Sequence, residues 1–503
     1  MTSISYAPDT GFAVDRWLGS TVEAAYQRLP EPFFARIGPE RVGTHPTLIH
    51  WSAGAAALID LDPAAFEAPD WTAVLAGHRP IPGASPIAMA YAGHQFGQWV
   101  PQLGDGRAIL IAQLRNARGQ LWDVQLKGAG RTPFSRFGDG RAVLRSCLRE
   151  YLASEAMAAL GIPTTRALAV VATGEAVVRE RVEPGAVMTR LAESHVRFGH
   201  FEYFAHQGRP ELVKALADHV IGEHWPELVD LDARYARWYA DIVARTADLV
   251  AAWQAIGFAH GVMNTDNMSI LGLTIDYGPY GFLDDFDPSL ICNHSDYTGR
   301  YAFDRQPAIA RWNLGALAWA LGSLVESDAA NAALADFERR VEEGLYARLR
   351  ARLGLTQARA GDAALVDTLL RMMAANRVDY TGTLRALADV VAAPATAEGA
   401  WRGRFAPAAQ GAVDDWLAHY RARLELEPDP SRPARMRAAN PRYIPRNWLA
   451  ETAIRAIEDH GDLTPLNDIS HVLRTPFDDH PGLEHYAEPP PAHLRDLEVS
   501  CSS

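Results

Sequence analysis

Between residues 100 and 130, hydrophobic and polar positions follow the patterns of two short β-strands. Ala108–Leu114 is a nearly continuous apolar run, and Leu121–Lys127 alternates apolar with polar side chains. The segment Asn116-Ala117-Arg118-Gly119 between them has the composition of a turn. Together these features predict an antiparallel pair of strands.

An apolar stripe with helical spacing follows within residues 143–152. It predicts a helix that opens at Gly138-Asp139-Gly140 and ends at Gly161-Ile162-Pro163. Two more strand-like segments, Ala167–Thr173 and Ala176–Arg179, come next. Strands, one helix and further strands indicate a small α+β lobe and not a repeated βαβ array.

From about Ser194 the pattern becomes mostly helical. Tyr235–Gly257 places large apolar side chains on one helical stripe, and further helices continue to about Leu426. One short segment interrupts them, because the strand-like stretches Met268–Leu271 and Leu273–Ile275 flank Gly272 and predict a tight hairpin.

These patterns divide the chain into four expected parts. Residues 1–80 form an N-terminal extension of mixed helix and loop, and residues 81–190 form a β-rich N-lobe. Residues 191–426 form a helical C-lobe that contains the loops discussed below. Residues 427–503, which are rich in proline, form a C-terminal wrap and tail.

Composition narrows the class of protein. A net charge of −13 argues against non-specific binding to nucleic acid or to an anionic membrane. No apolar run reaches the length of about 18 residues that a membrane-spanning helix needs. Residues 1–20 lack the pattern of a secretion signal, and three cysteines are too few for a disulfide framework or a multi-thiolate zinc site. We therefore expect a cytoplasmic protein with no nucleic-acid or membrane partner.

Two glycine turns and one lysine indicate an anion-binding site. The pentapeptide Gly-Asp-Gly-Arg-Ala occurs at residues 104–108 and again at residues 138–142. Glycines let backbone N–H groups approach phosphate, and an adjacent arginine can bind phosphate oxygens. Lys127, one of only two lysines in the chain, ends the strand after the first turn. Its acidic partner should come from the next helix, where Glu150 faces inward more than Glu155 does.

A second group of polar residues indicates a metal site. His260–Asn267 precedes the predicted hairpin, and Asp276-Tyr277-Gly278 follows it. An asparagine and an aspartate at the two ends of a hairpin can hold one hard cation such as Mg²⁺ through oxygen ligands. Asp266 lies beside this pair as a possible base.

The order of these motifs is that of a protein kinase: glycine loop, strand lysine, helix glutamate, catalytic loop and Asp-aromatic-Gly. One residue departs from it. A kinase has its catalytic aspartate five residues before the metal-binding asparagine, where this chain has Val262. Two interpretations stay open, a kinase without activity or different chemistry in the same cleft. Arg190 and Arg197 are seven residues apart, so they would share one face if this segment is helical, and two such arginines would suit a pyrophosphate that is bound and then leaves.

Longer stretches resemble the selenoprotein O family. They are Lys127–Pro133, Gly138–Ser146, Ser194–Glu202, His260–Gly278 and Asn440–Pro445. The resemblance implies a protein-kinase-like bilobal α+β fold. It also implies an enzyme that transfers AMP from ATP to Ser, Thr or Tyr hydroxyls of proteins. It also implies that ATP lies in the reverse sense to kinases, with its α-phosphate toward the acceptor, which would account for Val262.

The resemblance assigns roles to individual residues. The proton acceptor falls on Asp266, the Mg²⁺ or Mn²⁺ ligands fall on Asn267 and Asp276, and Glu150 matches the ion-pair partner of the lysine. The expected nucleotide-binding residues are Gly104, Gly106, Arg107, Lys127, Asp139, Gly140, Arg190, Arg197 and Asp276.

The resemblance also concerns a cysteine near the C-terminal end of the sequence. Cys501 stands where some members of the family have selenocysteine, and we hypothesise a disulfide between Cys501 and Cys292 that fixes the tail to the cleft.

The alternatives to adenylylation are a nucleotide-binding pseudokinase scaffold, a uridylyltransferase that uses manganese, and a small-molecule phosphotransferase.

Overall fold

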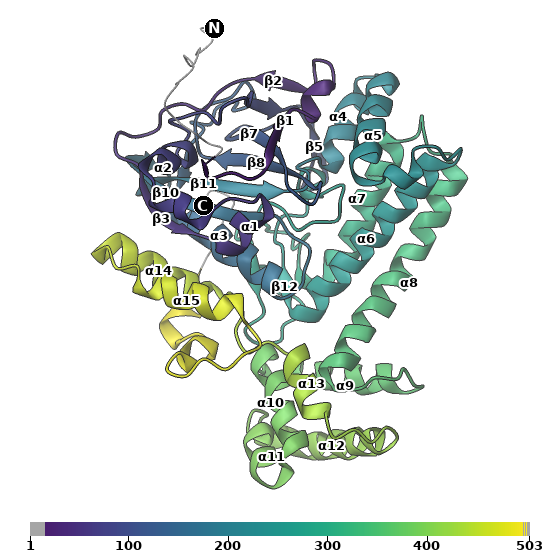
Figure 1. The fold of residues 1–503 in the computed structure, drawn as a ribbon. Helices are drawn as coiled ribbons and strands as arrows, with labels where there is room; N and C mark the ends of the chain where they lie inside the picture. Colours follow the sequence, from purple (N-terminus) through teal and green to yellow (C-terminus); the bar gives the residue numbers. More distant parts are fainter. Residues whose placement is uncertain (1–15, 496, 498, 500–503) are drawn as a thin grey trace.

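The architecture is α+β with two lobes, as the sequence predicts. The computed structural model describes residues 16–495, 497 and 499 (Figure 1). A nine-stranded antiparallel sheet dominates the first lobe, in the order β2-β4-β7-β8-β11-β10-β3, with β1 paired to β7 and β9 paired to β11. The strands are β1 (Thr21–Glu23), β2 (Phe34–Arg36), β3 (Thr47–Trp51), β4 (Ile87–Met89), β7 (Ala108–Arg115), β8 (Leu121–Lys127), β9 (Ala142–Val143), β10 (Arg166–Val178) and β11 (Val182–Ala192).

Strand β8 shows how the sheet separates a core from a site. Its even-numbered side chains, including Val124 and Leu126, pack into a buried cluster with the small helices α1 (Ala53–Leu58) and α2 (Pro69–Leu75). After Leu121, its odd-numbered side chains are Asp123, Gln125 and Lys127, which are also buried but are hydrogen-bonded. Alternation along a strand sends successive side chains to opposite faces, so the polar face of β8 is available to a site.

Helices form the rest of the molecule. The N-lobe contains α3 (Leu144–Ala159), whose apolar face packs on the sheet and on the C-terminal helices α14 and α15. Figure 1 shows α14 and α15 in yellow beside the sheet lobe and α9 to α13 as a separate extension of the helical lobe. The remaining helices are α4 (Phe198–His206), α5 (Pro210–His224), α6 (Arg234–Ile256), α7 (Gln306–Ala320), α8 (Ser327–Arg352), α9 (Asp362–Asn376), α10 (Tyr380–Ala392), α11 (Pro394–Arg402), α12 (Gln410–Glu425), α13 (Arg432–Ala439), α14 (Asn447–His460) and α15 (Thr464–Arg474).

Two short two-stranded ribbons lie between the lobes' main elements. The first is the hairpin of β5 (Gly93–Gln95) and β6 (Gln98–Val100), and the second pairs β12 (Phe258–Ala259) with β13 (Gly281–Phe282). The β12–β13 pair holds the two ends of the segment that contains Asp266 and Asp276. In the part of the chain that the structure describes, no helix is long and apolar enough to cross a membrane.

Two elements expected in the first 160 residues differ in the structure. The segment before residue 81, expected to be helix and loop, also supplies strands β1, β2 and β3 to the sheet. Helix α3 begins at Leu144, and the short strand β9 separates it from the turn at Gly138–Gly140. That turn is therefore not at a helix N-terminus, and the helix dipole does not add to anion binding there.

Two further expectations are wrong in the second half of the chain. The predicted hairpin at residues 268–275 is absent, because its backbone pairs with distant segments instead: Ser269 bridges to Arg197 and Thr274 bridges to Thr164. The proline-rich wrap after residue 427 is partly helical, since it contains α13.

Candidate active site

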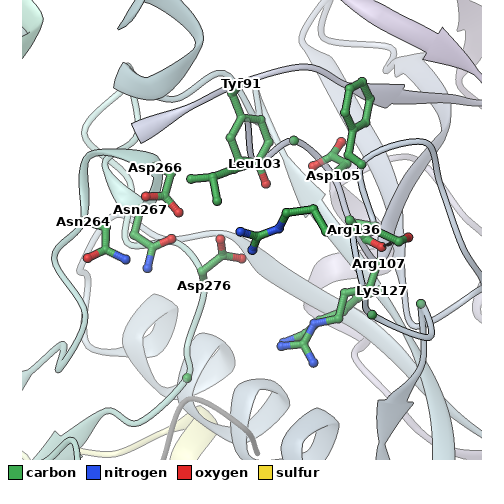
Figure 2. A pocket seen from close by; sticks show the side chains of 18 of the residues that line it. Tyr91, Leu103, Asp105, Arg107, Lys127, Arg136, Asn264, Asp266, Asn267 and Asp276 are labelled. Carbon is green, nitrogen blue, oxygen red and sulfur yellow. Dashed lines mark hydrogen bonds between the residues drawn. The ribbon is translucent and has the colours of Figure 1, made fainter. Parts of the chain in front are cut away.

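A cleft of about 730 Å³ lies between the sheet lobe and the segment of residues 262–279. Both Gly-Asp-Gly-Arg turns, Lys127 and the two arginines Arg190 and Arg197 line it, together with Asp266, Asn267 and Asp276. In Figure 2, Asp266, Asn267 and Asp276 lie on one side of the cleft, and Arg107 and Lys127 lie on the other. The structure therefore gathers in one cleft all the residues that the sequence predicts to bind nucleotide or metal.

Lys127 ends β8 and forms an ion pair with Glu150 of α3. Both side chains are buried, and the second oxygen of Glu150 accepts a hydrogen bond from Arg190 at 3.1 Å. Glu155, the other candidate partner, pairs instead with Arg166 at 2.8 Å on the opposite side of the helix. The pairing follows from the helical positions of the two glutamates, which lie about 140° apart.

Asp276 is the shared hydrogen-bond acceptor of two arginines in the cleft. Arg190 donates to one of its oxygens at 2.5 Å, and Arg197 donates to the other. Burial alone would raise the pKa of Asp276, but Arg197, Arg190 and Lys127 together hold this pKa well below its ordinary value. Asp276 has a φ of 56°, in the left-handed region that favours glycine, as is common for residues at functional sites.

The two arginines do not share a helix, contrary to the expectation from their spacing. Arg190 lies near the end of β11, and Arg197 is the residue before α4. The two residues are almost fully buried, at 4% and 2% exposed, and each guanidinium forms an ion pair with Asp276. Gln125 accepts two hydrogen bonds from Arg190, at 3.1 and 2.5 Å, and Arg197 also lies over the ring of Tyr91. These contacts fix both cations in the cleft.

Asp266 lies on the short turn of helix at Thr265–Asn267 and is 6% exposed. Burial raises its pKa to about 7, against the opposing effect of Arg197. Its Oδ2 accepts from Gln95 at 3.3 Å, whereas its Oδ1 is buried and has no hydrogen-bond partner among the described residues. Such an orphaned oxygen indicates an interaction that a ligand supplies.

The side-chain oxygens of Asn267 and Asp276 match the donors that Mg²⁺ or Mn²⁺ prefers. The amide nitrogen of Asn267 donates to the carbonyl of Val262 at 3.0 Å, which leaves its side-chain oxygen to act as a ligand. The described residues contain no cluster of three His, Cys, Asp or Glu side chains that could hold a metal alone. A cation here would therefore share its coordination with phosphate oxygens, as Mg²⁺ commonly does.

The glycines of the two turns are required by close contacts. Gly104 has a φ of 73°, and a Cβ there would lie 2.4 Å from the ring of Phe134. Gly140 has a φ of 72°, and a Cβ there would lie 2.2 Å from the carbonyl group of Gly130. The turn residues 131–140 thus fold directly over the first glycine turn at the mouth of the cleft.

Asp139 lies at the rim and is partly exposed. Arg179 donates to both of its oxygens, at 2.8 and 3.0 Å, and this pairing lowers the pKa of Asp139. Arg179 also lines the cleft. In the structure, the Asp139 carboxylate is therefore already held by a cation of the chain.

The residues that were not predicted from the sequence include Tyr91, Gln95 and Arg179, which line the cleft, and Gln125, which holds Arg190 from behind the lining. Gln125 had a signal, because it lies on the polar face of β8 with Lys127. The other three come from segments whose positions relative to the cleft depend on the tertiary fold.

Two of the three cysteines lie in the described part of the chain, and their surroundings differ. Cys147 is buried in the apolar core between α3 and the C-terminal helices. Cys292 lies in the loop after Asp276, partly buried against the carbonyl of Ala259, and Cys501 lies outside the described residues. Nearby, the backbone N–H of His294 donates to the carbonyl of Val499 at 3.0 Å. The end of the described tail thus lies beside the loop that contains Cys292.

Comparison with known proteins agrees with this geometry. The family model described as Protein adenylyltransferase SelO matches residues 17–474. A protein nucleotidyltransferase YdiU of Myxococcus xanthus is 52% identical over 480 residues, which cover 95% of this chain and 98% of the relative. Relatives with the same name from Thiobacillus denitrificans (49% over 487 residues, 96% and 99% coverage) and Rhodopseudomonas palustris (50% over 487 residues, 95% and 98% coverage) are similar throughout.

Proposed function

The chain belongs to the SelO family of protein adenylyltransferases, and we propose that it uses this cleft to transfer AMP from ATP to Ser, Thr or Tyr hydroxyls of proteins. Pyrophosphate is the leaving group. The main support is the convergence of Lys127, Arg190 and Arg197 around Asp276, with Asp266 beside them and an apolar valine at position 262.

The cationic side of the cleft suits the outer phosphates of ATP. Lys127, Arg190 and Arg197 are held by Glu150 and Asp276, so their positions are set before a ligand arrives. Phosphate oxygens are charged acceptors of the same kind as these carboxylates, and arginine binds them in a two-pronged manner. Fixed positive charge at this position stabilises the charge that develops on pyrophosphate as it leaves.

Asp266 is placed to accept the proton of the acceptor hydroxyl. In the proposed step, the hydroxyl oxygen forms a bond to the α-phosphorus while the bond from that phosphorus to the bridging oxygen of pyrophosphate breaks. The hydroxyl proton passes to the Asp266 carboxylate, whose Oδ1 has no other partner among the described residues. Val262 cannot accept a proton, so the base of an ordinary kinase is absent from its usual position.

Asn267 and Asp276 would hold a divalent cation, Mg²⁺ or Mn²⁺. When bound there, the cation would supply positive charge next to the phosphates. Asp276 suits this role because its low pKa keeps it ionised.

The test uses ATP labelled with ³²P at either the α or the γ position, incubated with a library of peptides that contain Ser, Thr or Tyr. Retention of the α label on peptide, and loss of the γ label as pyrophosphate, supports the proposal. Retention of the γ label would show kinase chemistry, and no retention of either label would show a scaffold. Parallel reactions with α-labelled UTP would reveal a preference for uridylyl transfer.

Variants connect the reaction to this cleft. Asp276→Ala should abolish transfer, whereas Asp287→Ala, in the acidic loop that follows, should leave it unchanged. Transfer by Asp276→Ala at the wild-type rate would refute the role of Asp276 as a metal ligand.

A further inference from the structure

We propose that an exposed group of aromatic side chains beside Asp266 is the docking surface for the acceptor protein. We call this group the aromatic patch, and it consists of His94, Phe96, Trp99, His206, Arg300, Trp312 and Trp319. The inference rests on the proposed function, because it identifies how the protein substrate of the same site is held.

The patch is a continuous array of rings from three elements. Trp99 of the β5–β6 hairpin stacks on His206 of α4 with ring centroids 3.6 Å apart, and His206 contacts Trp319 of α7 at 4.3 Å. His94 of the same hairpin contacts Trp312 of α7 at 5.2 Å. The three elements therefore present their aromatic side chains as one surface.

This surface is exposed to an extent that core packing does not require. Trp312 is 40% exposed, Trp319 is 56% exposed and Phe96 is 37% exposed. The two tryptophans are seven residues apart on α7, so they lie on the same helical face. Clustered, exposed tryptophan is typical of protein-binding surfaces, where it supplies much of the binding energy.

The hairpin connects the patch rigidly to Asp266. The backbone N–H of His94 donates to Thr265 at 2.7 Å, and that of Phe96 donates to Asn264 at 3.1 Å. Gln95, between them, donates to Asp266 at 3.3 Å. A side chain bound on the patch would therefore lie at a fixed position relative to the proton acceptor.

Close packing explains why this connection is rigid. At Gly93 a Cβ would lie 2.7 Å from Oδ1 of Asp266, so the hairpin backbone touches the catalytic segment directly. Phe96 belongs to the patch and also lines the cleft. The patch is thus continuous with the site at which the acceptor hydroxyl must arrive.

The charge of the patch indicates the chemistry of the partner. Arg300 lies over Trp312 at 5.0 Å and over Tyr301 at 5.8 Å. Arg300 is partly exposed, and no carboxylate among the described residues forms an ion pair with it. In a chain of net charge −13, this cation is suited to a carboxylate of the partner.

The partner that fits is a short segment of the acceptor protein that carries, near its hydroxyl residue, one large apolar side chain and one Asp or Glu. A second copy of this chain fits less well. A stable dimer uses about 20 to 30 residues on each side, whereas the patch has seven.

The experiment measures steady-state transfer of the α label to the best peptide from an arrayed library with a central Ser, Thr or Tyr. Trp312→Ala and Trp319→Ala should each raise the KM for peptide about 5- to 30-fold, the size expected for residues that dominate binding. Their kcat at saturating peptide and their Kd for ATP should stay within about twofold of wild type. Leu426→Ala, a control at an exposed apolar position on a distant helix end, should leave all three quantities unchanged.

Charge reversal provides a second, independent readout. Wild type should prefer peptides with an acidic residue near the acceptor, and Arg300→Glu should shift this preference to Lys or Arg. Since Arg300 lies at the surface of the patch, this test does not require removal of a packed ring.

Several outcomes would overturn the inference. Unchanged peptide KM in both tryptophan variants would do so, as would an unchanged sequence preference in Arg300→Glu. A dimer in solution that the tryptophan variants dissociate, with unchanged peptide KM, would assign the patch to a second copy instead. Failure of the proposed function is distinguishable, because wild type itself would then transfer no α label to any peptide.

Discussion

Asp276 accepts hydrogen bonds from two arginines that come from different parts of the chain. Arg190 reaches it from the end of β11 and Arg197 reaches it from the start of α4. Two buried guanidiniums would be costly without charged partners, so this carboxylate makes their burial possible. We infer that the same arginines bind phosphate because phosphate oxygens offer them equivalent partners.

Asp266→Asn is the most informative single substitution at this scale. It keeps the size of the side chain but removes its ability to accept the hydroxyl proton, so kcat for AMP transfer should fall about 10²- to 10⁴-fold. Equilibrium binding of ATP should change little, because the proposed phosphate contacts come from other residues. Comparable kcat in the variant and the wild type would remove Asp266 from the reaction.

At the scale of elements, the sequence predicts regular segments well and long-range pairings poorly. The β7–β8 pair and α6 match their predicted positions closely, because alternation and helical stripes are local signals. Strand β11 was missed, since Pro184 and Gly185 interrupt its pattern. The expected hairpin at residues 268–275 fails because its backbone partners, Arg197 and Thr164, are distant in sequence.

The same distinction applies to the site. The residue types and their order predict a kinase-like cleft, and the alternation of β8 predicts that Gln125 shares a face with Lys127. The position of Arg190 on a strand depends on the sheet, and so does the contact of Gln95 with Asp266. Neither has a signal in the local pattern.

Gly257 caps the C-terminal end of helix α6 in a left-handed conformation, so a substitution there gives a prediction about stability. Gly257 has a φ of 81°, and a Cβ there would lie 2.9 Å from the ring of Tyr380. Gly257→Ala should therefore lower the free energy of unfolding by about 1–3 kcal/mol, through backbone strain and the close contact. Urea unfolding would measure this, with Gly222→Ala as a control, since Gly222 lies within α5 and has open space around its Cβ position. Equal stability of Gly257→Ala and wild type would contradict the expectation.

The tail provides a prediction about cysteine chemistry. We propose that Cys292 and Cys501 form a disulfide, which the hydrogen bond between His294 and Val499 supports by placing the tail beside the Cys292 loop. Peptide mass analysis of oxidised protein without reduction should detect the cross-linked pair. Buried Cys147 should remain a thiol and serves as the internal control. Alkylation of both Cys292 and Cys501 in oxidised protein would exclude the disulfide.

At the scale of the whole molecule, buried histidines in several elements make the stability of the fold sensitive to acid. Burial lowers the pKa of His200 to about 3, and it lowers the pKa of His50 and His224 to about 4. Their ordinary pKa is about 6.5, so below that pH the unfolded chain binds more protons than the folded chain does. Their contribution to stability is complete above pH 6.5 and is lost as the pH falls toward 4.

The lowered pKa values predict how the free energy of unfolding changes with pH. The free energy of unfolding should decrease between pH 6.5 and 4 by as much as about 1.4 kcal/mol per pH unit for each of these histidines. Urea titrations at several pH values would measure the slope, and His50→Asn should reduce it. A free energy of unfolding that stays constant or rises as the pH falls through this range would contradict the assignment of buried neutral histidines.

The orientation of ATP is the central claim about the whole molecule, and a crystal structure with a non-hydrolysable ATP analogue and Mg²⁺ tests it most directly. We predict that the α-phosphate lies closest to Asp266 and the acceptor side, with the outer phosphates in contact with Lys127, Arg190 and Arg197. A γ-phosphate that faces Asp266, with Arg190 and Arg197 making no contact to any phosphate, would contradict the account.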